Sequence, residues 1–146
     1  MLTNGKTTPA ADTGRVLPMN LKSLKSLLVV GPTANDITVQ AHTYHGTPSK
    51  WVTILDGING TLQSQAPHVS LTYIQGCDRT STGTSAKAGF SKATAAVAQA
   101  DAVIFIGGLQ ASMEEEGTDR VNDMGHPGVQ LDLIKALHSA ARAKSS

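Results

Sequence analysis

Three consecutive glutamates, Glu114, Glu115 and Glu116, follow an apolar run in the stretch SMEEEGTDR. Neighbouring carboxylates and partial burial both raise the pKa of a carboxyl group. A carboxylic acid that stays protonated near neutral pH can give its proton to a leaving oxygen, so the cluster is a candidate for general acid catalysis. Such an acid works with a second carboxylate, and Asp36 and Asp78 each follow an apolar run of their own.

A solvated surface charge run is the alternative interpretation of the same stretch. Asp119 and Arg120, which close it, would then form exposed ion pairs that contribute less than about 1 kcal/mol each. Composition alone does not choose between a catalytic cluster and a charged surface.

Other patterns of catalytic or binding residues are missing from the sequence. The glycine fingerprint of a dinucleotide site would follow the first apolar run, but the chain reads VVGPTAND there, with Pro32 in the pattern. The phosphate-binding P-loop and the GxSxG nucleophile elbow are also absent. His42 and His45 are close enough in sequence to share a metal ion, but solvated loop histidines are the simpler interpretation. We therefore expect neither a metal nor a cofactor, and a nucleotide-binding protein is disfavoured.

Composition indicates one globular domain and excludes several classes of partner. The chain has 146 residues, of which 40% are hydrophobic and 16% charged, with a net charge of +1. No basic block indicates binding to nucleic acid or to an anionic membrane, and no apolar run approaches the roughly 20 residues that span a bilayer. The single cysteine, Cys77, cannot form an internal disulfide or a structural zinc site. The polar N-terminus lacks the apolar core of a signal peptide, and the sequence does not determine the cellular compartment of the protein.

Two periodicities alternate along the chain. Short, β-rich apolar runs that end at glycine predict three buried strands. The strands are expected at residues 26–32, 69–76 and 102–108. Apolar residues at helical spacing predict three helices, the last opening with Pro127 as its first residue. The helices are expected at residues 51–64, 89–101 and 126–144.

Each predicted helix carries an apolar stripe that we expect to face the sheet. The stripes are Val52, Leu55, Ile58 and Leu62; Phe90, Ala93, Val97 and Ala100; and Val129, Leu133, Leu137 and Ala140.

The alternation of strands and helices predicts an α/β fold. We expect a three-layer α/β/α sandwich with a mainly parallel, Rossmann-like sheet, truncated to about three strands in the order 2-1-3. Residues 1–25 are expected to be an N-terminal loop or linker, and residues 26–146 a partial sandwich domain. Because ligands of such sheets bind beyond the carboxyl ends of the strands, the loop that holds the glutamates lies at the expected site.

Several motifs, in order, resemble glycoside hydrolase family 3, the β-glucosidases and β-xylosidases. LPMNLKSLKSLLVVGPTAND is similar to the start of that family's second, α/β sandwich domain, and YHGTPSKWVTILDGI, LTYIQGCD, ADAVIFIGGLQASMEEEGTDR and PGVQLDLIKAL follow in family order. The resemblance covers about residues 16–138 and is greatest for the xylosidase-like branch.

The resemblance implies part of a retaining glycosidase that acts on a β-linked gluco- or xylo-saccharide. It implies that Glu114 is the acid/base, with Glu116 as the second candidate, and that Asp119 and Arg120 help to bind substrate. It further implies a (β/α)8 barrel domain that carries an aspartate nucleophile, so the isolated chain is expected to be inactive or nearly so. Family members are often secreted or periplasmic, whereas this chain shows no signal peptide. Its location is therefore unknown.

Three departures from the family pattern stand out. TTPAADTGR looks like an insertion, VNDMGHPG is more polar and one residue longer than the family's approach to its PG motif, and the chain stops where the family's sheet continues. A stand-alone carbohydrate-binding or assembly module is therefore the alternative function. A third strand without an outer neighbour also predicts a homodimer through the open sheet edge, unless the N-terminal tail covers that edge.

Overall fold

The computed structural model describes residues 17–41, 44–120 and 124–144. Strands and helices alternate along the chain, with a short 3-10 helix after each of the first two strands. In order, the elements are β1 (Ser26–Val30), η1 (Ile37–Gln40), α1 (Ile54–Gln65), β2 (Ser70–Ile74), η2 (Ser85–Lys87), α2 (Phe90–Val97), β3 (Ala102–Phe105) and α3 (Gln130–Lys144).

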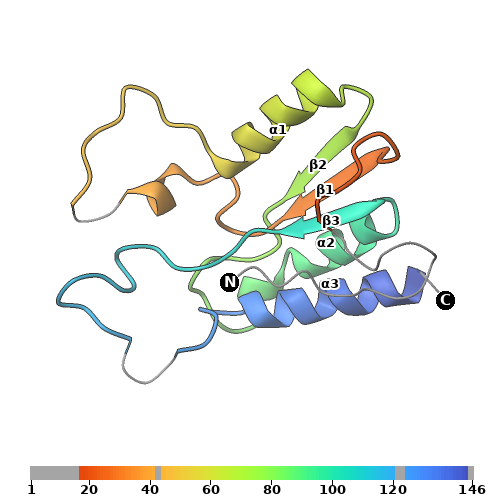
Figure 1. The fold of residues 1–146 in the computed structure, drawn as a ribbon. Coiled ribbons are helices and arrows are strands. Elements are labelled where there is room, and N and C mark those ends of the chain that lie inside the picture. The colour runs from red at the N-terminus through yellow and green to blue at the C-terminus, as the bar shows by residue number, and fades with distance from the viewer. Residues whose placement is uncertain (1–16, 42–43, 121–123, 145–146) are drawn as a thin grey trace.

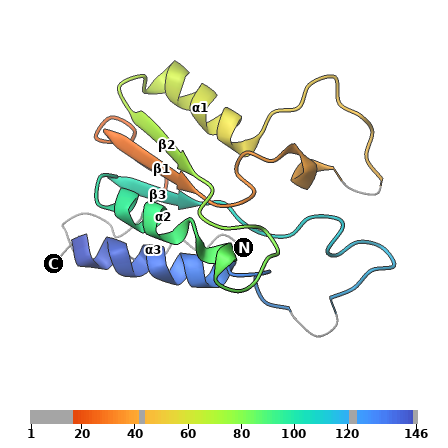
Figure 2. The same ribbon diagram turned by 180° about the vertical axis from the view of Figure 1, so that it is seen from behind.

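The sheet is parallel and has the strand order β2-β1-β3, which confirms the predicted fold class. The register places Leu27 of β1 beside Leu71 of β2 and Ala102 of β3. α1 covers one face of the sheet, and α2 and α3 lie side by side on the other (Figures 1 and 2). The three layers follow from right-handed crossovers between parallel strands. A helix on the opposite face of the sheet would make its β-α-β crossover left-handed, which is disfavoured.

Two apolar cores lie on the two faces of β1. Leu28 and Val30 point into the core beneath α2 and α3, whereas Leu27 and Val29 point into the core beneath α1. Because successive side chains of a strand face opposite sides, a run with no polar residue is what a strand covered on both faces requires.

α1 begins three residues later than the sequence pattern indicates. The hydroxyl of Thr53 accepts a hydrogen bond from the Asp56 N–H at 3.0 Å, and the Asp56 carboxylate accepts one from the Thr53 N–H at 3.1 Å. This capping box satisfies two N–H groups that the first turn leaves open, so it fixes the helix start at Ile54. The prediction that Val52 lies on the buried stripe is therefore wrong: its side chain is 47% exposed.

α3 also begins later than expected, at Gln130 rather than near Pro127. Gly128 has a φ of +58°, in the left-handed region, so the chain cannot continue a right-handed helix through it. A Cβ on Gly128 would lie 2.7 Å from the carbonyl oxygen of Ser81, so the backbone passes close to the loop after β2 at this point. The buried stripe itself is as predicted, with Leu133 and Leu137 in the core.

The connecting segments are partly packed. Within the expected linker of residues 1–25, the described part contains Leu24, which is buried, and Leu21, which packs on the core under α1. Residues 1–16 of that linker lie outside the described residues. None of the described helices has both the length and the apolar character needed to cross a membrane.

We expect Leu133→Ala to lower the free energy of unfolding by about 2–5 kcal/mol, because Leu133 has no exposed surface and its truncation leaves a cavity. Leu131→Ala, on the same helix but 42% exposed, is the matched control and should cost less than about 1 kcal/mol. Urea unfolding followed by circular dichroism measures both values. Equal losses in the two variants would show that α3 does not present the Leu133 side to the sheet.

Candidate functional site

The loops that follow the strands extend from one edge of the molecule, at the left of Figure 1. The loops after β1 and β3 diverge at this edge. They diverge because β2, to which β1 connects, and β3 lie on opposite sides of β1 in the sheet. They first pass very close: Gly31 has a φ of +140°, and a Cβ there would lie 1.9 Å from the carbonyl oxygen of Ile106. Only glycine fits at this crossing.

The glutamates lie on the segment Gly107–Arg120, which we call the acid loop. Its central feature is a tight turn in which Glu115 and Thr118 exchange two backbone hydrogen bonds, of 3.0 and 2.9 Å. Gly117, with a φ of +81°, supplies the left-handed residue within this turn.

Glu114 is bound by Arg120 across this turn. The Nε of Arg120 donates to a carboxylate oxygen of Glu114 at 2.9 Å, and Nη1 of Arg120 donates to the carbonyl oxygen of Gly125 at 2.9 Å. The arginine side chain is only 17% exposed. Arg120 therefore lies largely out of solvent, and its guanidinium joins Glu114 to the carbonyl of Gly125, which follows the acid loop.

Glu116 is bound from a different part of the chain. The hydroxyl of Tyr44, in the segment between η1 and α1, donates a hydrogen bond to the Glu116 carboxylate. In the same segment the rings of His45 and Trp51 meet edge to face, with centroids 6.3 Å apart. The alternative in which His42 and His45 share a metal ion involves a residue, His42, that lies outside the described residues. Asp119 is exposed at the end of the acid loop.

A second ion pair joins the loops after β1 and β2. Nη1 of Arg79 lies 2.5 Å from a carboxylate oxygen of Asp36 and 3.2 Å from the hydroxyl of Thr38. Hydrogen bonds from the Thr38 hydroxyl and N–H, with the nearby Arg79 charge, lower the pKa of Asp36 below its ordinary value of 3.8. Asp36 is therefore occupied as a structural anion, while Asp78, the other candidate partner carboxylate, is exposed.

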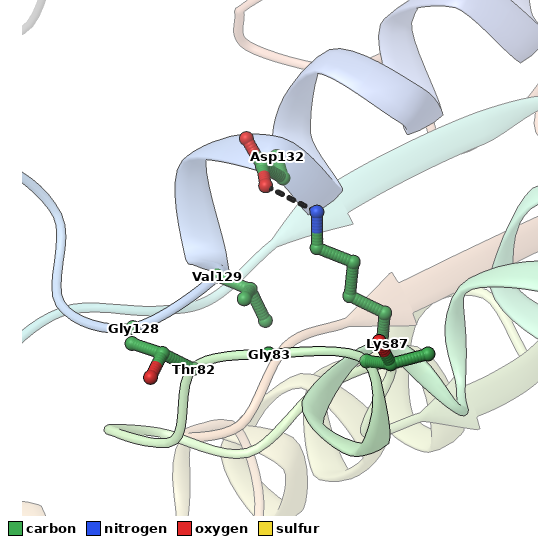
Figure 3. Close-up of a pocket in the computed structure, with 7 residues that line it drawn as sticks. Thr82, Gly83, Lys87, Gly128, Val129 and Asp132 are labelled. Atoms are coloured by element: carbon green, nitrogen blue, oxygen red, sulfur yellow. Dashed lines mark hydrogen bonds and ion pairs between the residues drawn. The ribbon is translucent and has the colours of Figure 1, made fainter.

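A pocket of about 440 Å³ lies between the loop after β2 and the start of α3. Figure 3 shows Lys87 and Asp132 pointing toward one another across it, and their charged atoms are 2.6 Å apart. None of the predicted site residues lines this pocket. Its two charged groups neutralise each other, so it offers no charged group for a ligand.

The remaining titratable clusters give no second centre. Burial raises the pKa of the Cys77 thiol to about 11, so this cysteine stays protonated and is a poor nucleophile. Over residues 17–41, 44–120 and 124–144, no group of three His, Cys, Asp or Glu side chains is arranged to hold a metal ion.

Three residues that organise this edge were not found by sequence reasoning. They are Tyr44, Arg79 and Gln130. The best signal was available for Gln130, a polar residue spaced by three and seven from the buried Leu133 and Leu137. A polar residue on the buried face of a helix needs hydrogen-bond partners inside the protein. For Tyr44 and Arg79 the sequence alone gives no comparable signal.

The chain is similar to several known proteins. Residues 2–144 match the sequence family described as the glycosyl hydrolase family 3 C-terminal domain. β-D-xylosidase 3 of Arabidopsis thaliana is 37% identical over 126 residues, which are 86% of this chain and 15% of that protein. The chain thus spans about 15% of the length of this relative.

Solved structures give the same result. An exo-β-xylosidase in complex with a xylobiose aziridine activity-based probe is 36% identical, with a TM-score of 0.70 over 84% of this chain and 15% of that one. A β-glucosidase from Erythrobacter marinus has a TM-score of 0.65 at 22% identity, over 85% of this chain and 19% of that one, and shows the fold alone.

The Asp36 interactions generate a pH-dependent prediction. Folding lowers the pKa of this carboxyl group, so its contribution to stability is present above the ordinary value of 3.8 and disappears as the pH falls through the lower folded-state value. We expect Asp36→Asn to lower the free energy of unfolding by about 1 kcal/mol at neutral pH and by progressively less below pH ~4.

Urea titrations across the acid range measure this effect. Asp78→Asn removes the same charge from an exposed position and is the matched control, with a change within about 0.5 kcal/mol. A destabilisation by Asp36→Asn that does not shrink at acid pH would contradict the assignment.

Proposed function

Because the chain belongs to the glycosyl hydrolase family 3 C-terminal domain family, we propose that it supplies the acid/base loop and part of the sugar site of a retaining β-glycosidase. Glu114 is the proposed acid/base and Glu116 the second candidate. The observation that carries the proposal is the position of Glu114: it lies on the loop after β3, at the carboxyl edge, in direct contact with Arg120. That edge is where ligands of parallel α/β sheets bind.

The proposed chemistry needs a proton donor and a nucleophile on opposite sides of the scissile bond. Glu114 gives its proton to the glycosidic oxygen as the bond breaks, and then takes a proton from the water that releases the sugar. Arg120 holds the carboxylate in place, and the exposed Asp119 beside it is available for hydrogen bonds to sugar hydroxyls.

The nucleophile is proposed to come from a (β/α)8 barrel domain. Retaining glycosidases hold two carboxyl groups about 5–5.5 Å apart, and a covalent intermediate forms on the second. Large apolar side chains are exposed on the loops and at the helix starts after β1 and β3, which supports docking of another domain there. They are Ile37, Tyr44, Val52, Ile54, Leu109 and Met124. Without that domain the chain is expected to be inactive, or to act only as a carbohydrate-binding module.

The proposed substrate class is a β-linked xylo-oligosaccharide. The Arabidopsis relative is named a β-D-xylosidase, and the xylosidase structure holds a xylobiose-derived probe. The similarity to a β-glucosidase is confined to the fold, so it gives less support to a β-linked gluco-saccharide.

A segment exchange tests the role of Glu114. This chain replaces the matching 126-residue segment of the Arabidopsis enzyme, and gel filtration with circular dichroism verifies folding. In this composite enzyme, Glu114→Ala should lower kcat/KM about 10²–10⁴-fold for xylosides with poor leaving groups. The loss should be smaller for good leaving groups, which need no proton, and azide should rescue the second step.

Glu115→Ala is the matched control, since it removes the adjacent carboxylate from the same turn. The same pattern in Glu116→Ala instead of Glu114→Ala would transfer the role to Glu116. The isolated chain is the baseline: rapid hydrolysis of a nitrophenyl xyloside by it, abolished by Glu114→Gln, would show that no barrel is needed.

The outer edge of β3 supports a homodimer of the isolated chain. The N–H of Ile106 donates to the carbonyl of Val30, at 2.8 Å, so residues 102, 104 and 106 face β1. In a parallel ladder alternate residues face opposite neighbours, and Val103 and Phe105 therefore direct their backbone groups to the outer edge, where none of the described strands pairs with them. Such an edge is a template for a second strand.

We expect the chain to sediment as a dimer at micromolar concentration, with Val103→Pro shifting it to monomer. Proline removes an N–H that faces outward and leaves the β1–β3 ladder intact. Ile104→Pro, which breaks that ladder, is the contrasting variant and should unfold the protein. A monomer whose amides at 103 and 105 resist hydrogen exchange would contradict the dimer and favour coverage by another part of the chain.

A further inference from the structure

The side chain of Gln130 is fully buried at the start of α3 and forms three hydrogen bonds to backbone groups. Its Oε1 accepts from the N–H of Gly108 at 2.8 Å. Its Nε2 donates to the carbonyl of Gly108 at 3.1 Å and to the carbonyl of Arg79 at 2.9 Å. Both amide hydrogens and one oxygen lone pair are used, so the carboxamide is held in one orientation.

These partners lie on loops that follow different strands. Gly108 is the second residue of the acid loop after β3, on the same loop as Glu114. Arg79 lies after β2, and its guanidinium pairs with Asp36 after β1. One side chain of α3 therefore connects, directly or through Arg79, the loops after all three strands.

The carboxamide lies directly against the start of the acid loop. A Cβ on Gly107 would lie 2.3 Å from Oε1 of Gln130, so a larger residue there would displace the carboxamide. Gly108 follows with a φ of +138°, in the region that favours glycine. At the start of the loop, a larger residue at 107 would thus displace the Gln130 carboxamide, and one at 108 would have a strained backbone.

An apolar residue at position 130 would fill the space but not satisfy the backbone. It would leave the N–H and carbonyl of Gly108 and the carbonyl of Arg79 without their present partner, and polar groups shielded from water are destabilising when they lack a hydrogen bond. The acid loop could regain its hydrogen bonds only by moving toward water. A glutamate would repel both carbonyls while it is ionised.

We propose that Gln130 is a positioning residue for the acid/base: by binding both polar groups of Gly108, it sets the direction in which the acid loop leaves β3 and so the location of Glu114. It need not touch the sugar. The catalytic meaning of this role rests on the function proposed above, whereas the attachment of the loop does not.

The attachment is tested on the chain itself, without substitution. In nuclear magnetic resonance spectra, the Nε2 protons of Gln130 and the Gly108 amide should exchange with water at least about 10²-fold more slowly than exposed groups, because all are hydrogen-bonded to one another or to the Arg79 carbonyl. Exchange of the Gln130 carboxamide at the rate of an exposed glutamine such as Gln63 would overturn the proposal.

Gln130→Met then tests whether the loop depends on the carboxamide, since methionine has nearly the same shape and no amide. Amide exchange over residues 108–120 should rise about tenfold or more relative to that of β1. Leu137→Ala is the matched control, because it weakens the packing of the same helix without touching the loop. It should accelerate exchange across all elements alike. The same uniform change in both variants would make Gln130 a general core residue and overturn the proposal.

In the composite enzyme, Gln130→Met should lower kcat about 10–10²-fold with little change in KM, since a misplaced catalytic group slows chemistry more than binding. Leu137→Ala should leave kcat within about twofold at a temperature where the enzyme is folded. A loss of kcat that is equal in both variants contradicts positioning. If exchange behaves as expected but Glu114→Ala is silent, the proposed function fails and the attachment of the loop remains.

Discussion

The structure depends on the complete enclosure of β1. Its neighbours β2 and β3 occupy both edges, α1 covers one face, and α2 and α3 cover the other, so Leu27 to Val30 are almost without exposed surface. A strand enclosed in this way must be apolar on both faces. Parallel pairing on both edges also brings the carboxyl ends of all three strands to one side, where every polar loop of interest begins.

The enclosure of β1 leaves little room at that edge. Glycine residues and buried hydrogen bonds allow the loops to pass there. Gly31 allows the chain after β1 to pass against Ile106, and Gly107 allows the chain after β3 to pass against the Gln130 carboxamide. The backbone groups that this crowding removes from water are bonded by Gln130, whose own burial is possible only because its partners are present. Packing and polar satisfaction thus select the same path for the acid loop.

The same edge explains how three adjacent glutamates are tolerated. Arg120 forms an ion pair with Glu114, and Tyr44 binds Glu116, while Glu115 lies in the tight turn that it closes with Thr118. Each charge therefore has its own partner or surroundings, which a run of like charges on a free helix face would lack. In this member of the glycosyl hydrolase family 3 C-terminal domain family, two carboxylates of the loop after β3 are therefore each held by a named partner.

Periodicity in the sequence was sufficient to predict the strands, the parallel order 2-1-3 and most of the buried stripes, because burial on two faces imposes an unbroken apolar pattern. The helix starts were displaced, since the Thr53 capping box and the left-handed Gly128 decide them through local geometry that periodicity does not record. The glutamate cluster was also visible in the sequence as a candidate site. Its partners were decided only by the tertiary structure: Tyr44 and Glu116 are 72 residues apart, and Gln130 and Arg79 are 51 apart. Such contacts depend on how loops from separate strands meet at one crowded edge, and no local pattern of residues encodes that meeting.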